Sequence, residues 1–322
     1  MERLIFVLSV SLGSVALGYV IRRAVLDRYV RSKERVKMVS KDMKLTAMFV
    51  LNPIPIVSSF WGFTLVSRSL ISFPFLGILC TAVGGISALI INALLKIPPK
   101  QAASVFTSGM FSNIVTFGGL TAFVFFGADG YVLILLFNLF IVVMYYMVGF
   151  PISEQVSQGS RFRFSLSFDI LKERPYIFVP IISIAVGLAL NGIGLSRPHL
   201  IETVSSVLIP LISGLLGFSI GITLYIGRIQ SYVREILLIM LIKFGISPMV
   251  MTSIGLLIGL QDVMGGMPFK ILVISSAMPV AFNSLLPPAI YGFDLDLANS
   301  AWVVTTFSYL VILPILYLLL AL

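Results

Sequence analysis

Charged side chains are scarce in this sequence, and they make up only 11% of its 322 residues. A soluble globular domain carries about 25% charged residues, so this chain has too little polar surface to face water on all sides. Cysteine is nearly absent too, because Cys80 is the only one. One cysteine excludes an intrachain disulfide and a cysteine-based metal cluster, so we expect Cys80 to be a packing residue.

Acidic residues are missing from the interior of the hydrophobic blocks, since all thirteen fall in predicted loops or near block ends. Asp129, Asp294 and Asp296 lie closest to the blocks. Their placement argues against a proton relay built on a membrane carboxylate. Carbonyl and amide oxygens could still hold sodium, so ion coupling stays open. His199, the only histidine, lies in a loop with Glu202 and is interpreted as a surface residue. We expect no metal and no cofactor.

Hydrophobic residues make up 58% of the chain and fall into long blocks. A helix of about 20 apolar residues crosses the roughly 30 Å hydrocarbon core of a bilayer. We therefore predict an all-α polytopic membrane protein, with the lipid bilayer as its environment. The first block lacks the basic leading region of a signal peptide and is interpreted as a span. The ten predicted transmembrane helices are 4–21, 43–61, 70–95, 101–126, 131–150, 176–194, 203–226, 235–260, 269–292 and 299–320.

The distribution of basic residues predicts the orientation of these spans. Seventeen of the 22 Lys and Arg residues lie in the loops after odd-numbered spans, and four lie on the opposite side. Basic loops face the cytoplasm, so we predict a multi-pass protein of the cell (plasma) membrane with both termini outside. The net charge of +9 is spread over short loops between apolar blocks, which does not indicate a nucleic-acid partner.

Short internal matches indicate two related halves. Residues 50–55 resemble 207–212, and residues 107–110 resemble 275–278, at equivalent places in two sets of five spans. We predict an N-terminal repeat over 1–152, a cytoplasmic connector over 153–175 and a C-terminal repeat over 176–322. The connector is either a solvated linker or an interfacial segment. Because five spans reverse the starting side, the repeats are inverted, an architecture typical of secondary transporters.

Two equivalent spans, 101–126 and 269–292, contain residues that interrupt helices. Pro279, Pro287 and Pro288 remove backbone donors from the second of these spans. In the first, Asn113 lies among weak helix formers and before the glycine pair 118–119. Matching breaks in matching spans predict a binding site near the middle of the membrane, where half-helix ends direct N–H groups into the gap.

Asn113 and Asn283 add side-chain amides to this gap, and such donors suit an anion, above all a carboxylate. The alternative is that each asparagine makes an ordinary hydrogen bond between helices. Lys243 is the only charged residue far from a span end. It would attract an anion, pair with a carbonyl at a break, or extend its ammonium toward the cytoplasmic surface.

Other helix breakers and glycines are interpreted as packing features. We expect kinks at Pro53, Pro55 and Pro210. The span 203–226 carries a stripe of small residues that predicts close helix packing: Gly214, Gly217 and Gly221.

The chain resembles the auxin efflux carrier family, within the bile-acid and arsenite transporter superfamily. The segments that carry this resemblance are Pro210 with Gly217-Phe-Ser-Ile-Gly221, Lys243 with Pro248, Ala277-Met-Pro279 to Ala289-Ile-Tyr-Gly-Phe-Asp294, and Ala298-Asn-Ser300. The chain departs from the family in its fourth span. There the family has Gly-Asn followed by glycine and proline, and this chain has Ser112-Asn113 with no proline up to Gly118.

The resemblance implies a scaffold of spans 1, 2, 6 and 7 and a mobile transport domain of spans 3–5 and 8–10, with broken helices 4 and 9 crossing at the site. A homodimer through the scaffold helices is a further expectation. The candidate substrate-binding residues are Asn113, Asn283, Ser112, Pro279, Pro287 and Lys243.

The leading hypothesis is an efflux-type secondary transporter that moves a small organic anion by elevator-like alternating access. A dicarboxylate and an auxin-like aromatic acid are both plausible substrates. The alternative is a sodium- or proton-coupled symporter of the bile-acid type. A sensor on a transporter fold would need an output domain, which we do not expect. An intramembrane enzyme would need paired aspartates, a serine with a histidine, or a metal set, so we expect no enzyme.

Overall fold

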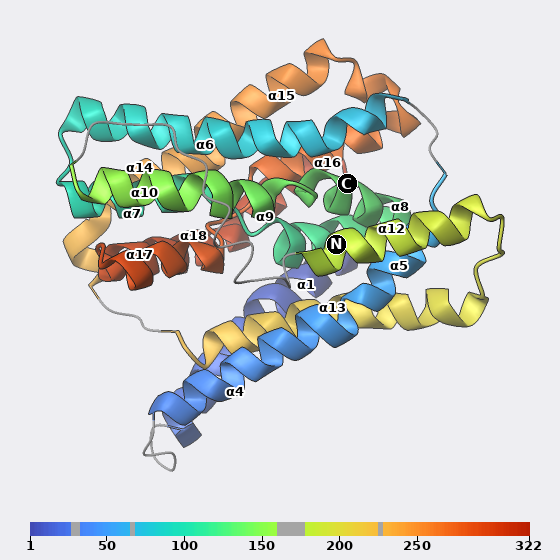
Figure 1. Cartoon of the computed structure of the whole chain (residues 1–322), viewed down its shortest axis with the longest axis horizontal. Coiled ribbons are helices and arrows are strands. Elements are labelled where there is room, and N and C mark those ends of the chain that lie inside the picture. Colours follow the sequence, from blue (N-terminus) through green and yellow to red (C-terminus); the bar gives the residue numbers. More distant parts are fainter. Residues whose placement is uncertain (27–32, 65–67, 160–177, 225–227) are drawn as a thin grey trace. The chain divides into compact units, whose positions relative to one another are not determined.

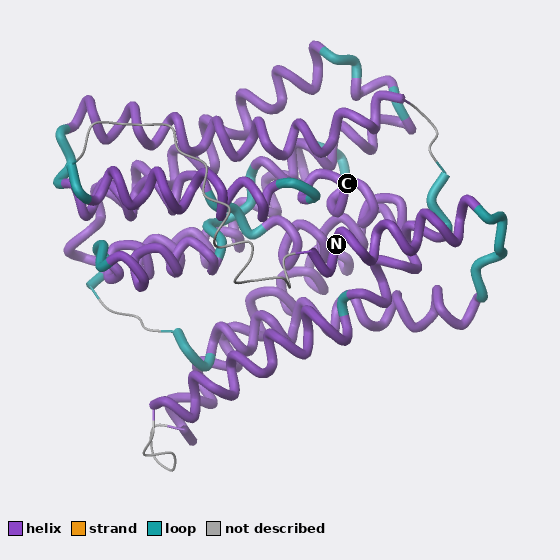
Figure 2. The backbone as a smooth tube through the Cα atoms, in the orientation of Figure 1, coloured by secondary structure: helices purple, strands orange, loops and turns teal. Residues whose placement is uncertain are grey.

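The described part of the chain is built from helices. The computed structural model describes residues 1–26, 33–64, 68–159, 178–224 and 228–322 (Figure 1). Within these ranges the only strand-like feature is one isolated antiparallel bridge (Figure 2). The predicted all-α fold class is confirmed for these residues.

Seven helical stretches are long and apolar enough to cross a membrane. Two shorter apolar helices, Val179–Gly192 and Met264–Ser276, lie in the predicted spans 176–194 and 269–292. The seven stretches are Glu2–Ala24, Glu34–Trp61, Leu70–Leu95, Ile114–Ser157, His199–Gly221, Ile229–Leu257 and Leu295–Leu319. Helix is found in all ten predicted ranges, and Gly127, at φ 68° and ψ −153°, interrupts the longest stretch between two of them.

Large apolar side chains cover the outside of these helices, and small polar ones lie inside. Leu257, Leu318 and Leu94 are 84%, 76% and 75% exposed. Ser104, Thr107 and other hydroxyl side chains are fully buried. A water-soluble protein shows the opposite tendency, so the surface fits lipid as its solvent. The chain is therefore a multi-pass membrane protein.

The helices form two compact units, each made from segments of both predicted repeats. The first unit comprises 1–66, 115–135 and 176–225, and the second comprises 67–114, 136–175 and 226–322. The α-helices that lie wholly in the first unit are α1 Glu2–Leu8, α2 Ser14–Ile21, α4 Lys33–Thr46, α5 Pro53–Trp61, α12 Val179–Gly192 and α13 His199–Gly221. Those of the second are α6 Phe73–Leu95, α7 Pro99–Met110, α9 Ile141–Met144, α10 Phe150–Ser157, α14 Val233–Leu241, α15 Ser247–Leu257, α16 Met267–Ser276, α17 Leu286–Tyr291 and α18 Leu295–Leu319. Helix α8, Gly119–Asn138, has residues in both.

Glycines bring α2 and α13 into close contact in the first unit. A Cβ atom on Gly217 would collide with the Ser14 hydroxyl, and one on Gly221 would collide with the Val15 carbonyl oxygen. On Gly214, a Cβ would meet only a Val10 methyl group at 3.8 Å. The predicted packing stripe is confirmed at Gly217 and Gly221.

Helix α7 forms the centre of the second unit. Every residue from Ala102 to Met110 is buried, and α7 packs against α6, α10 and α18 (Figure 1). A Cβ atom on Gly84 of α6 would collide with the Gly109 carbonyl oxygen, so these two helices cross backbone to backbone. This close packing fixes the end of α7, where the first helix break begins.

Prolines coincide with wide turns in several spans. Three π-helical turns precede, directly or by one residue, an α-helix that carries proline in its first turn: Ala47–Leu51 before Pro53, Tyr145–Gly149 before Pro151, and Ile242–Ile246 before Pro248. A π-turn accommodates the missing N–H and the bulk of the ring without ending the span. Helix α13 continues through Pro210.

Helix α10 extends to Ser157, into the predicted connector 153–175, whose residues from 160 onward lie outside the described part.

Candidate substrate site at two broken helices

The first helix break follows α7. Phe111 leaves the helix with extended angles, φ −92° and ψ 124°, and the next helical residue is Ile114. The prediction placed Asn113 at a break, and the structure confirms it. The glycine pair 118–119 lies within helical turns, so the break itself comprises residues 111–113.

The second break follows α16. Ser276 ends the helix, and residues 277–281 are not helical until a 3-10 turn begins at Phe282. Pro279 explains this stop, because it offers no N–H and its ring disfavours the helical conformation of Met278. Pro287 and Pro288 play a different part, since both are buried in the first turn of α17, where proline is compatible with a helix.

The two breaks pair with each other. Asn113 N–H donates to the Pro279 carbonyl oxygen at 2.8 Å, and Ala281 N–H donates to the Phe111 carbonyl oxygen at 3.0 Å. These bonds flank the antiparallel bridge between Ser112 and Val280. We call residues 111–113 and 279–281 the crossing. Two chain segments 168 positions apart thus satisfy each other's backbone hydrogen-bonding groups at the point where neither continues as a helix.

Neighbouring side chains satisfy further backbone groups of the crossing. Ser112 N–H donates to the Tyr145 hydroxyl oxygen at 2.8 Å, and Val280 N–H donates to Thr305 Oγ1 at 3.2 Å. Tyr145 is held by stacking on Phe111, with ring centroids 4.0 Å apart. The sequence predicted free N–H groups in the gap, but the N–H groups of 112, 113, 280 and 281 are all occupied. A ligand at these four residues must therefore be bound by side chains or carbonyl oxygens.

Lys243 supplies a buried amine at the crossing. It lies in the π-turn Ile242–Ile246 between α14 and α15, is 1% exposed, and donates from Nζ to Ser112 Oγ at 2.7 Å. It therefore does not extend to the surface, which was one of the predicted alternatives. Among the described residues, the ion pairs are Arg197–Glu202 and Arg228–Asp296, and neither involves this lysine.

Asn113 is also incompletely satisfied. The residue is 8% exposed, and its side-chain Nδ2 is buried without a hydrogen-bond partner. Asn283 is half-buried in the 3-10 turn Phe282–Leu285, just beyond the crossing. Other buried side-chain atoms of the second unit without a partner are Asn92 Oδ1, Ser108 Oγ, Ser284 Oγ, Ser300 Oγ, Trp302 Nε1 and Thr306 Oγ1. Buried polar atoms are normally paired, so such a concentration requires an explanation.

Sequence reasoning missed Tyr145, Thr305 and Trp302. Thr305 lies one residue from the unpaired hydroxyl of Thr306, and the Trp302 ring packs edge-on against Phe282 at 6.2 Å. Polar atoms in the apolar spans 131–150 and 299–320 were the signal that could have indicated them. Tyrosine, threonine and tryptophan are common enough in spans that this signal is weak.

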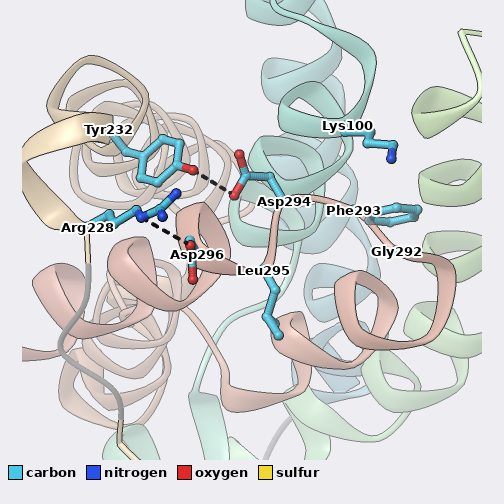
Figure 3. A pocket seen from close by; sticks show the side chains of 8 residues that line it. All are labelled: Lys100, Arg228, Tyr232, Gly292, Phe293, Asp294, Leu295 and Asp296. Carbon is cyan, nitrogen blue, oxygen red and sulfur yellow. Dashed lines mark hydrogen bonds and ion pairs between the residues drawn. The ribbon is translucent and has the colours of Figure 1, made fainter.

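A second polar cluster lies at the start of α18 (Figure 3). Tyr232 donates to Asp294 Oδ1 at 3.0 Å, and the same oxygen accepts from Leu297 N–H at 3.0 Å as a helix cap. Arg228 lies 3.8 Å from Asp296. Arg228, Tyr232, Asp294 and Asp296 line an open cavity of about 430 Å³. Asp294 pairs with Tyr232 and with the Leu297 N–H, and Asp296 pairs with Arg228. Because both carboxylates are paired within the protein, the arrangement fits a helix cap.

No group of three or more His, Cys, Asp or Glu side chains that could hold a metal ion occurs in the described ranges. The donors at the crossing are an amine, an amide and hydroxyl groups.

Comparisons with known proteins point to transport. No family model matches the chain. The chain is 26% identical over 237 residues to an uncharacterized transporter of Methanocaldococcus jannaschii, and the match covers 72% of this chain and 73% of that protein. The chain is thus a multi-pass helical protein with similarity to a transporter.

Proposed function

We propose that this protein is a secondary transporter that carries a small organic anion with a carboxylate group, bound at the crossing. The observation that carries this proposal is the Lys243 amine. It is buried against the Ser112 hydroxyl of a broken helix, and no carboxylate of the described residues pairs with it. A buried cation without an ionic partner is costly, and a carboxylate ligand would supply that partner.

Asn113 completes the recognition of a carboxylate in this proposal. One carboxylate oxygen accepts from Lys243 Nζ, and the other accepts from Asn113 Nδ2, which has no partner in the protein. Hydrogen bonds to a charged group contribute about 1.5–3 kcal/mol each, enough to select carboxylates over neutral analogues. Asn283, close by in the chain, contributes a second amide, and Pro279 and Pro287 shape the backbone around it.

Movement of the ligand follows the auxin efflux carrier pattern in our proposal. The second unit contains the crossing together with Tyr145, Lys243 and Thr305, which supports a transport domain that moves the site by elevator-like alternating access. The proposal includes ten spans in two inverted repeats, placement in the plasma membrane with both termini outside, and a homodimer through the scaffold helices.

Uptake into proteoliposomes tests the proposal. Radiolabelled succinate, pyruvate and indole-3-acetate are offered to vesicles with purified protein, and leakage into protein-free vesicles is subtracted. We expect saturable uptake of at least one of the three. Asn113→Ala is expected to raise KM by about tenfold or more, because the variant loses one charge-assisted hydrogen bond to the substrate. Asn283→Ala is expected to weaken uptake in the same direction.

Asn138→Ala is the matched control, because Asn138 is a half-buried asparagine at the end of α8 and outside the crossing. Its KM should equal that of the unaltered protein. If the Asn113 and Asn283 variants fold and transport normally, the proposed site is wrong. If none of the three acids is taken up, the proposed substrate class is wrong.

A further inference from the structure

The partner of Lys243, the Ser112 hydroxyl, can form a hydrogen bond with the amine in either of its protonation states. The Ser112 hydroxyl lies 2.7 Å from Nζ. A hydroxyl oxygen accepts a hydrogen bond from an ammonium group, and its own hydrogen can be donated to the lone pair of a neutral amine. A carboxylate or carbonyl oxygen in that position would accept only and would favour the ammonium form. The site is therefore built to tolerate both forms.

No fixed negative charge faces this amine from the elements packed around it. Lys243 lies in the turn Ile242–Ile246, whose main neighbours among the described helices are α6, α14 and α15. The titratable residue of α6 is Cys80, close enough to interact electrostatically with Lys243, and α15 has none. On α14, Arg234 and Glu235 lie in the first turn, about 12 Å of helix rise away. Tyr145 faces the site through its bonds to Ser112 and also lies beside Cys80 and Thr81 of α6.

Two electrically neutral arrangements are available to such a site. One is a neutral amine with no ligand, and the other is an ammonium group paired with a carboxylate. An ammonium without an anion, or an anion beside a neutral amine, would place an uncompensated charge in a buried position, which costs several kcal/mol. Binding of the anion and binding of the proton therefore favour each other.

We propose that Lys243 carries one proton with each anion, so that this transporter is proton-coupled without any membrane carboxylate. The inference rests on the proposed function and deepens it. The Nζ lone pair takes a proton from water on the side where the anion binds, and an N–H bond forms. After the site turns to the other side, the anion leaves, the N–H bond breaks, and the proton passes to water. Transport of a monocarboxylate then moves no net charge, and transport of a dicarboxylate moves one net negative charge.

A lysine that stays charged throughout the cycle is the competing arrangement. The empty carrier would then return with a positive charge, and each monocarboxylate would move one net negative charge. Transport would respond to membrane potential and ignore a pH gradient. The two arrangements thus differ in what drives the flux, and this difference can be measured.

The test uses proteoliposomes in which valinomycin and equal potassium concentrations clamp the potential at zero. Succinate, pyruvate and indole-3-acetate serve as probes, with leakage into protein-free vesicles subtracted, and lumenal pyranine reports protons. We expect an alkaline lumen to drive accumulation of the transported acid, with one proton entering per anion. If an acid is transported without protons and its uptake follows only an imposed potential, the coupling is wrong and the proposed function stands. If no probe is transported, the proposed function fails and the coupling with it.

Lys243→Arg separates the two arrangements further, because guanidinium keeps its proton. Under proton coupling, the empty variant cannot return uncharged. We then expect net uptake to fall by about tenfold or more while exchange of internal for external anion continues. Potential-driven net uptake at the unaltered rate in this variant would overturn the proposal. Lys270→Arg is the matched control, since Lys270 lies on α16, is half-buried, bonds to the Ala321 carbonyl and lies outside the crossing. It should leave the proton-to-anion ratio unchanged.

Discussion

Replacing Lys243 by methionine is expected to make the protein more stable while it loses anion transport. Methionine has a similar unbranched shape and fills the space of the lysine stem. The change removes one hydrogen bond to Ser112 Oγ, which contributes about 1.5–3 kcal/mol if the amine is charged. It also removes the cost of keeping the amine 1% exposed, which is several kcal/mol whether the buried group stays charged or gives up its proton at pH 7.

The balance of these two contributions favours methionine. Ser112 is half-buried, so its hydroxyl loses little when the lysine is gone. We expect a gain of about 1–3 kcal/mol, in the range measured when buried ionic groups are replaced by apolar residues. For a chain of this size, that gain corresponds to a rise in melting temperature of about 1.5–4.5 °C.

The assay is thermal unfolding of the purified protein in detergent, followed by intrinsic fluorescence, together with proteoliposome uptake of the acid that the unaltered protein carries. Lys270→Met is the control and should change neither quantity. A fall in melting temperature for Lys243→Met would show that the lysine stabilises the fold, and normal uptake would show that it does not bind the anion. Either result would refute the reasoning that this amine is kept for function at the expense of stability.

Two further changes test the packing around the site and in the first unit. Thr305→Val leaves the buried Val280 N–H without its partner and should lower the free energy of unfolding by about 1–3 kcal/mol. Thr306→Val removes a hydroxyl that has no partner and should leave the free energy of unfolding unchanged. Equal melting temperatures for the two variants would show that the Thr305 bond is unimportant. Gly221→Ala places a Cβ against the backbone of α2 and should cost about 1–3 kcal/mol by overpacking, whereas a Cβ on Gly214 makes an ordinary contact with a Val10 methyl group, so Gly214→Ala should be neutral. Chemical denaturation followed by circular dichroism gives both values, and an unaffected Gly221 variant would contradict the close packing of α2 and α13.

Much of the site could be anticipated because its residues violate the pattern of an apolar span. Pro279 interrupts a hydrophobic block, and Lys243 places a charge inside one, so each is visible without a structure. The expectation of free N–H groups at the breaks fails at residues 112, 113, 280 and 281 for a physical reason. A buried backbone N–H group that has no partner within its own helix finds one elsewhere. Here the partners come from the other break, from Tyr145 and from Thr305.

The sequence by itself determined that this protein is a multi-pass helical membrane protein, because hydrophobic length and the scarcity of charge are local properties of the chain. It also located both helix breaks, since proline and weak helix formers act on their own backbone. Only the tertiary structure decided that Ser112 meets Val280 and that the Lys243 amine bonds to the Ser112 hydroxyl. Those contacts join residues that are 131 and 168 positions apart. They depend on how the helices pack against one another, and no local sequence pattern encodes that packing.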